Sequence, residues 1–134
     1  MMRLSRRDLQ AISDRVLKAY RRLPEAAADP ARIDPDLLLT ALLKLTIDYR
    51  RLSEDGRTLG FTSFDEVGIE VFDGPEDMYF LDGKTVLIED ALNADRDRVG
   101  RRNFTVMHEG SHHILNMLFP GEYKSGANAR RILR

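Results

Sequence analysis

The spacing of apolar residues changes twice along this chain of 134 residues, and those changes limit the folds open to it. In three stretches apolar side chains recur at intervals of three and four, as on one face of a helix. These stretches are residues 5–23, residues 37–45 and, after Asn93 or Asp95, the residues up to about 119. Ser5 and Asp34 precede the first two stretches and are suitable N-caps, and Pro24 and Pro120 follow the first and the third as helix stops.

The residues between the second and third helical stretches have the alternating, β-branched pattern of strands. The predicted strands are residues 46–52, 59–64, 68–72, 78–81 and 84–88. The last two flank Asp82-Gly83, and this dipeptide between two apolar runs predicts a β-hairpin. We therefore expect one α+β domain over residues 1–134, with N-terminal helices, a small and mainly antiparallel sheet, and a final helix.

The composition excludes several other classes of protein. The chain has no cysteine, so a disulfide framework, a cysteine-based zinc finger and a thiol nucleophile are all excluded. No run approaches the roughly 18 apolar residues of a membrane span, and the charged N-terminus lacks the apolar core of a signal peptide. We therefore expect a cytoplasmic protein with no membrane partner.

The balance of charges argues against a dedicated nucleic-acid-binding protein. Lys and Arg together number 21 and Asp and Glu 22, whereas such proteins normally carry a clear basic excess. Direct nucleic-acid binding is a minor hypothesis that would use five arginines: Arg101, Arg102, Arg130, Arg131 and Arg134. We expect these arginines to form a solvated basic face instead.

All three histidines lie within six residues of the last predicted helix, and two of them belong to an H-E-x-x-H motif. On a helix, His108 and His112 lie one turn apart on one face, where two imidazoles can bind one zinc ion. Glu109 follows the first histidine, where its carboxylate can take a proton from an attacking water and pass it to the leaving amine. The motif therefore predicts a zinc hydrolase with His108 and His112 as ligands and Glu109 as general base.

The other residues of this helix receive less specific interpretations. His113 points about 100° away from His112, so we expect it to support the ligands or to lie at the surface. One stripe runs down the helix, and we expect its members Met107, Leu115 and Leu118 to lie in the core. The stripe consists of Val99, Phe104, Met107, Ser111, Leu115 and Leu118. Thr105 has the position for a local hydrogen bond. The alternative to a metal site is a partly buried helix whose histidines make only hydrogen bonds.

A catalytic zinc site normally has three protein ligands, and the motif supplies two. The metzincin pattern is excluded because Leu115 and Leu118 stand where it needs a glycine and a third histidine. Glu122 is the one acid after His112, and it is a possible ligand if the chain folds back past Pro120-Gly121. We expect the upstream acids, Asp73, Glu76, Asp77, Glu89 and Asp90, to be poorer candidates.

The segment of residues 102–115, RNFTVMHEGSHHIL, resembles the active-site helix of the ImmA/IrrE metallopeptidases. In that family an R-x-[RN]-F-T-type segment leads into H-E-x-x-H. The order of N-terminal helices, small sheet and active-site helix is also similar over residues 5–120.

The resemblance implies a zincin-like fold and a cytoplasmic zinc endopeptidase of the minimal gluzincin type. By matching positions, His108 and His112 would bind zinc and Glu109 would be the general base. Family members typically cleave a DNA-binding repressor that controls a mobile element, a prophage or a stress response, so the implied partner is a protein such as a helix-turn-helix repressor. The strand at residues 84–88 would be the edge along which the substrate adds.

The sequence departs from the family after the motif. The family takes its third ligand from an acid on a later helix, in a segment similar to E-x-x-A-N-x-F-A. Here Ala127-Asn128 match, but Lys124 stands at the position of the acid. We expect either a fragment that lacks its C-terminal ligand-bearing segment or a degenerate site. A degenerate site would leave a non-catalytic binding module that regulates a repressor by forming a complex with it.

Overall fold

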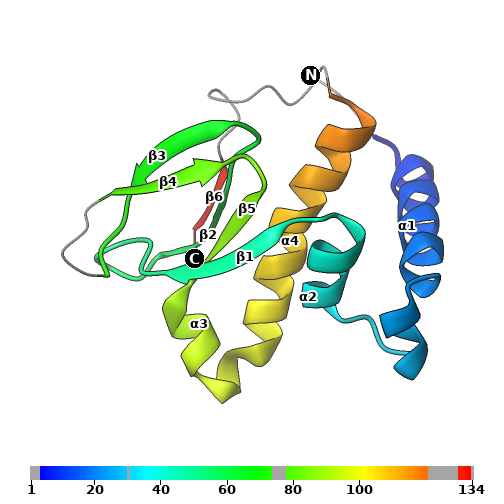
Figure 1. Cartoon of the computed structure of the whole chain (residues 1–134), viewed down its shortest axis with the longest axis horizontal. Helices are drawn as coiled ribbons and strands as arrows, with labels where there is room; N and C mark the ends of the chain where they lie inside the picture. Colours follow the sequence, from blue (N-terminus) through cyan, green and yellow to red (C-terminus); the bar gives the residue numbers. More distant parts are fainter. Residues whose placement is uncertain (1–3, 30, 74–77, 121–129, 134) are drawn as a thin grey trace.

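The computed structural model describes residues 4–29, 31–73, 78–120 and 130–133 (Figure 1). The N-terminal helices, five strands and the long motif helix follow the predicted order along the chain. A short helix at residues 90–94 and a last strand at residues 130–133 were not predicted. The helices are α1 (Arg6–Arg21), α2 (Pro35–Leu37), α3 (Asp90–Ala94) and α4 (Val99–Leu118). The strands are β1 (Thr46–Arg50), β2 (Thr58–Thr62), β3 (Glu66–Glu70), β4 (Met78–Asp82), β5 (Thr85–Glu89) and β6 (Arg130–Leu133). The α+β class is therefore confirmed.

Side-chain caps begin the first two helices as predicted. Ser5 Oγ accepts from the Asp8 amide at 3.0 Å, and Asp8 Oδ2 accepts from the Ser5 amide at 3.0 Å, so α1 starts with a capping box. Asp34 Oδ1 accepts from the Asp36 amide at 3.0 Å. The second helix is shorter than predicted, because a wider π-helical turn replaces regular α-helix over Leu38–Leu42. Lys44 then adopts a left-handed conformation, with φ of 60°, before β1 begins.

The strands form two sheets, whereas the sequence predicted one. Four strands pair in the order β1-β5-β2-β6, with β1 and β5 parallel and the other pairs antiparallel. The other two strands, β3 and β4, pair only with each other, in antiparallel fashion. A register shift between Thr58 and Gly60 marks a bulge in β2. Most strand pairs are antiparallel, as predicted.

The predicted hairpin around Asp82-Gly83 is wrong, since β4 pairs with β3 and β5 pairs with β1 and β2. The physical reason is burial. Every residue of β5 is buried, which requires a neighbour on each side and a layer on each face, whereas β4 buries one face only. Gly83, with φ of 85°, makes the turn at which the chain changes sheets. The same topology makes residues 84–88 an interior strand, so the predicted substrate-binding edge is wrong as well.

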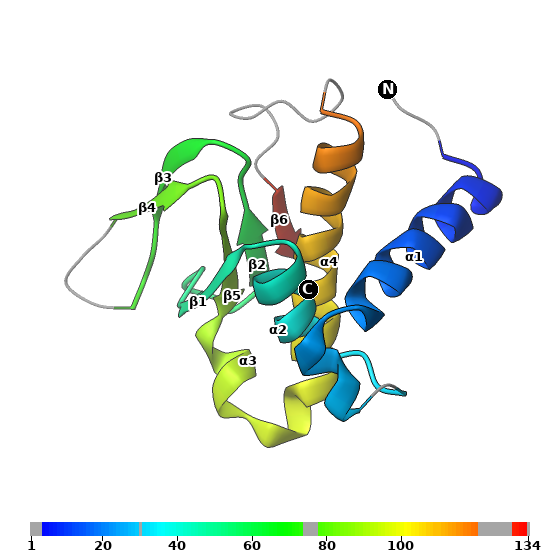
Figure 2. The ribbon, with the colours of Figure 1, turned by 45° about the vertical axis from the view of Figure 1, so that its right-hand side comes forward.

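Two apolar clusters hold the layers together. The residues Val86 and Ile88 of β5 pack toward the helices with Val106 of α4, and Leu87 packs toward β3 and β4 with Phe61 and other apolar residues. Figures 1 and 2 show α4 between the four-stranded sheet and α1, with β3 and β4 at the opposite end of the molecule from α1. Within the described ranges, no helix is both long enough and apolar enough to cross a membrane.

Candidate metal centre

The motif lies in the middle of α4, on a helix that begins close to where the sequence predicted. Asp95 Oδ1 accepts from the Asp97 amide at 2.9 Å and starts a short 3₁₀ turn that leads into α4. The helix ends at Leu118, just before Pro120. Twenty residues of continuous helix therefore position the motif on a rigid element.

The two predicted zinc ligands converge. His108 Nε2 and His112 Nε2 lie 3.2 Å apart, and their ring centroids are 4.9 Å apart. Two nitrogens bound to one tetrahedral zinc, each at about 2.0–2.1 Å, lie about 3.3 Å from one another. His108 is exposed and His112 half-buried, so an ion between them would be reachable from solvent. The spacing of these two nitrogens therefore fits a shared zinc ion.

Glu109 is the most unusual side chain of the helix. It is completely buried, and neither carboxyl oxygen has a hydrogen-bond partner among the described residues. Burial raises its pKa to about 8. A buried carboxyl group without partners is unfavourable for folding and is a recognised feature of functional sites.

Gly60 of β2 provides the space that Glu109 fills. A Cβ atom at Gly60 would lie 2.9 Å from Glu109 Oε2 and 2.9 Å from Thr105 Cγ2. Our sequence analysis did not single out Gly60, although an isolated glycine inside a strand indicates close approach of another chain segment. The glycine therefore lets α4 lie against β2 with an acidic residue at the contact.

His113 is buried, so the expectation of a possible surface position is wrong. Its Nε2 lies 2.5 Å from Thr62 Oγ1, with which it shares a hydrogen bond, and its ring meets Phe64 edge-on with centroids 5.0 Å apart. Burial lowers the pKa of His113 to about 4, so the imidazole is neutral near pH 7. His113 therefore joins α4 to β2 and the residues that follow it.

The predicted core residues of α4 are at most partly buried, because the helix buries a different face. Met107 packs against the main core and Leu115 is half-buried, whereas Leu118 is exposed. The buried residues of the helix are Thr105, Val106, Glu109, Gly110 and His113. Gly110 permits this contact, since a Cβ there would lie 2.5 Å from Leu39 Cδ1. In the predicted stripe Phe104 is 65% exposed. The expected local bond of Thr105 is present: its hydroxyl donates to the Arg101 carbonyl at 2.8 Å.

No third ligand joins the two histidines in the part of the chain that the structure describes, where no group of three His, Asp or Glu side chains could hold a metal. Glu122 and Lys124 lie outside the described residues, as do Glu76 and Asp77. Two other upstream acids have structural partners. Asp73 pairs with Arg50 at 3.6 Å, and the Glu89 carboxylate accepts from the amides of Leu52 and Ala91 at 3.0 Å each.

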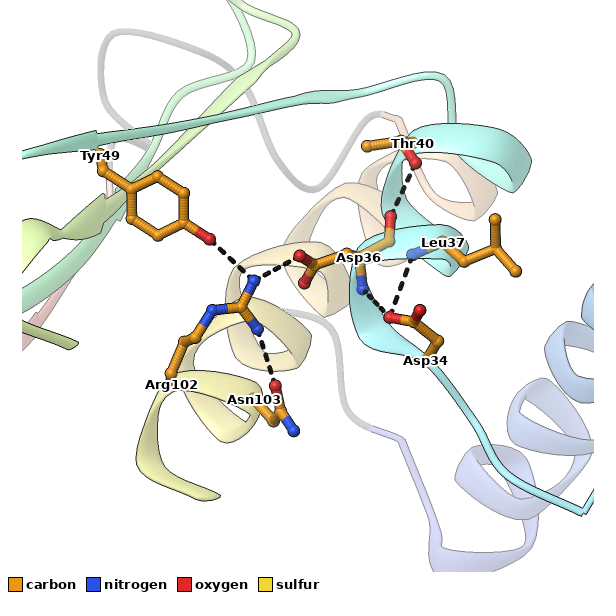
Figure 3. A network of polar contacts seen from close by, with 7 residues as sticks. All are labelled: Asp34, Asp36, Leu37, Thr40, Tyr49, Arg102 and Asn103. Carbon is orange, nitrogen blue, oxygen red and sulfur yellow. Dashed lines mark hydrogen bonds and ion pairs between the residues drawn. The ribbon is translucent and has the colours of Figure 1, made fainter. Parts of the chain in front are cut away.

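Arg102 is a structural anchor (Figure 3). Its guanidinium donates to the Asp36 carboxylate on α2, to Tyr49 Oη on β1 at 2.7 Å, and to Asn103 Oδ1 at 2.7 Å. These contacts fix the N-terminal part of α4 against α2 and β1. They also engage one of the five arginines considered for nucleic-acid binding.

Comparisons with known proteins add no family assignment. No protein-family model matches this sequence, and neither the curated proteins nor the solved structures gave a match. The resemblance to the ImmA/IrrE metallopeptidases therefore rests on residues 102–115 and the order of elements.

Proposed function

We propose that this protein is a zinc-dependent endopeptidase with a zincin-like fold, and that its substrate is another protein. The observation behind this proposal is the 3.2 Å separation of His108 Nε2 and His112 Nε2. Glu109, the residue directly after His108, adds a buried carboxyl group. Two converging imidazoles and a buried carboxyl group without described partners do not stabilise a helix, and such groups are typical of functional sites.

In this proposal each residue has a separate task. His108 and His112 hold the zinc ion, which when bound polarises a peptide carbonyl and makes water more acidic. Glu109 accepts the proton of the attacking water and then donates it to the departing amine. Its raised pKa in the protein without metal suits a group that must both accept and release a proton near neutral pH. A transcriptional repressor is the proposed substrate, because of the resemblance of residues 102–115.

A second candidate is a non-catalytic module of the same fold that binds a repressor without cleaving it. The observation that favours it is the presence of only two candidate ligands among the described residues. The two candidates differ in their dependence on Glu109, because binding alone needs no general base.

Zinc content and peptide cleavage test the proposal together. The chain, purified without chelators, should contain one zinc ion per molecule by elemental analysis, and His112→Ala should lose it. Incubation with candidate helix-turn-helix repressors should yield fragments detectable by mass spectrometry, and Glu109→Gln should abolish them while keeping the zinc. Absence of zinc from the purified protein would refute the enzyme. A stable complex with uncut repressor, unchanged by Glu109→Gln, would identify the binding module instead.

A further inference from the structure

The β3–β4 hairpin has one face that no other element of the described chain covers. In its register, Glu66 lies opposite Asp82, Gly68 opposite Phe80 and Glu70 opposite Met78, so these six residues share a face. The intervening residues, among them Ile69 and Leu81, are buried against the main sheet. Figures 1 and 2 show the hairpin at the end of the molecule farthest from α1. The outward face is therefore an accessible surface remote from α1.

Two large apolar side chains form the centre of this face. Phe80 is 79% exposed, the most exposed large apolar side chain in the described part of the chain, and Met78 is 46% exposed. Both lie over Gly68, where a Cβ would come within 2.9 Å of Phe80 Cε1 and 3.1 Å of Met78 Cε. Because Gly68 on β3 has no side chain, the Phe80 ring and the Met78 thioether lie together over it and form one apolar platform.

Acidic side chains surround the platform. Glu66, Glu70 and Asp82 are exposed on the same face, and none forms an ion pair with a described residue. Glu66 and Asp82 occupy directly opposite positions, an arrangement of like charges that destabilises a strand pair. A hollow of about 420 Å³ lies beside Phe80 and is lined by these two acids. Asp82 Oδ1 accepts from the Lys84 amide at 2.8 Å and from the Thr85 hydroxyl at 3.0 Å, and these bonds stabilise part of its charge. A cation in this hollow would further reduce the repulsion between Asp82 and Glu66.

We propose that this face of the hairpin is a docking surface for a basic, extended segment of a partner protein. An Arg or Lys of the partner stacks its stem on Phe80 and places its charge between Glu66 and Asp82, and an apolar side chain of the partner packs on Met78. The same face of a second copy would bring acidic rims together, and a nucleic acid or an anionic membrane would be repelled by them. The charge of the rim therefore selects a basic protein segment.

Binding of designed peptides to the full chain tests this surface. The full chain is titrated into a fluorescein-labelled peptide of alternating Arg and Val, and binding is followed by anisotropy. Two labelled control peptides, one of alternating Glu and Val and one of alternating Arg and Ser, are titrated in the same way. We expect binding of the first peptide only, with affinity that falls as salt rises. Phe80→Ala should weaken binding about tenfold and Glu66→Gln severalfold. Amide shifts in ¹⁵N spectra should map to β3 and β4.

Matched controls separate this surface from any other acidic or aromatic site. Phe104→Ala removes another exposed phenylalanine, beside the histidine pair, and Glu54→Gln removes an exposed carboxylate outside the hairpin. Neither should change peptide affinity. Equal weakening by Phe104→Ala, shifts centred on α4, or binding that Phe80→Ala leaves intact would overturn the proposal. So would a dimer in sedimentation experiments that Phe80→Ala dissociates, because the face would then bind a second copy.

Discussion

At the scale of single residues, the contact between α4 and β2 combines a glycine with a buried acid. Glu109 fits only because Gly60 has no side chain. The contact buries a carboxyl group that has no hydrogen-bond partner among the described residues, which is unfavourable for folding. The motif spacing predicted that His108 and His112 lie close together, as they do, whereas the ligand and base roles of His108, Glu109 and His112 stay predictions. The spacing did not predict Gly60, because Gly60 and Glu109 are 49 positions apart and only folding brings them together.

Replacement of Gly60 by alanine should destabilise the protein. The added methyl group would lie 2.9 Å from both Glu109 Oε2 and Thr105 Cγ2, so these buried side chains or the helix that carries them must shift. We expect a loss of about 1–3 kcal/mol in the free energy of unfolding, measured by urea denaturation. Gly100→Ala is the control, because a Cβ at Gly100 meets no atom within 4 Å. Equal stability of the Gly60→Ala variant and the parent protein would contradict the packing described here.

Replacement of Glu109 by methionine should raise stability and abolish hydrolysis. Methionine fills a similar volume without a polar group to desolvate, so the protein without metal should gain about 1–3 kcal/mol. Glu109→Gln is the control, since it retains a buried polar group and should gain less. Thermal and urea denaturation of chelator-treated proteins measure the difference. A methionine variant less stable than the parent would show that the carboxyl group has a stabilising partner.

At the scale of elements, Arg102 decides how α4 joins the rest of the fold. One guanidinium bonds to α2 and β1, which are distant in sequence, and to the adjacent Asn103 on α4 (Figure 3). The sequence predicted the helix and its approximate ends correctly, because spacing and caps are local. The core residues that it predicted on this helix are at most partly buried, because glycines at positions 60 and 110 make a polar face the closest-fitting one.

Removal of the Arg102 side chain should loosen α4. Arg102→Ala leaves the Asp36 carboxylate and the Tyr49 hydroxyl without their donor, and we expect a loss of about 1–3 kcal/mol. Arg101→Ala, at the exposed neighbouring position, should change stability by less than about 0.5 kcal/mol. Arg102→Lys should recover only part of the loss, because an ammonium group lacks the planar fork that reaches several acceptors. Similar effects of Arg101→Ala and Arg102→Ala would argue against the anchor.

At the scale of the whole molecule, side-chain bonds join the hairpin to the main sheet beside their shared apolar core. Thr85 Oγ1 of β5 donates to Asp82 Oδ1 of β4 at 3.0 Å. Tyr79 Oη of β4 donates to Asp48 Oδ2 of β1 at 2.7 Å. Burial raises the pKa of Tyr79 to about 12, and the bond to Asp48 contributes to the same shift. The folded protein therefore holds this phenolic proton to higher pH than the unfolded chain, in which tyrosine ionises near 10.

Stability should consequently fall as pH rises from about 10 to about 12. Above pH 10 the unfolded chain releases the Tyr79 proton while the folded protein retains it, which favours unfolding over this interval. Tyr79→Phe should make the free energy of unfolding less dependent on pH there and should remove an absorbance step near pH 12 at the wavelength of tyrosinate. Asp48→Asn should shift that step to lower pH. Loss of a step near pH 10 in Tyr79→Phe, with the titration near pH 12 unchanged, would refute the assignment.

The sequence by itself determined the order of the N-terminal helices, of strands β1 to β5 and of the motif helix, together with two of the helix caps, but it did not predict α3 or β6. The features that it determined all depend on residues close together in the chain, whose spacing sets which face of an element is apolar and where it can begin. Only the tertiary structure decided which strands pair, which face of α4 is buried and that the hairpin keeps an uncovered acidic and apolar face. Those choices depend on competition for burial between segments far apart in sequence, such as β5 against β4, and local spacing holds no information about its outcome.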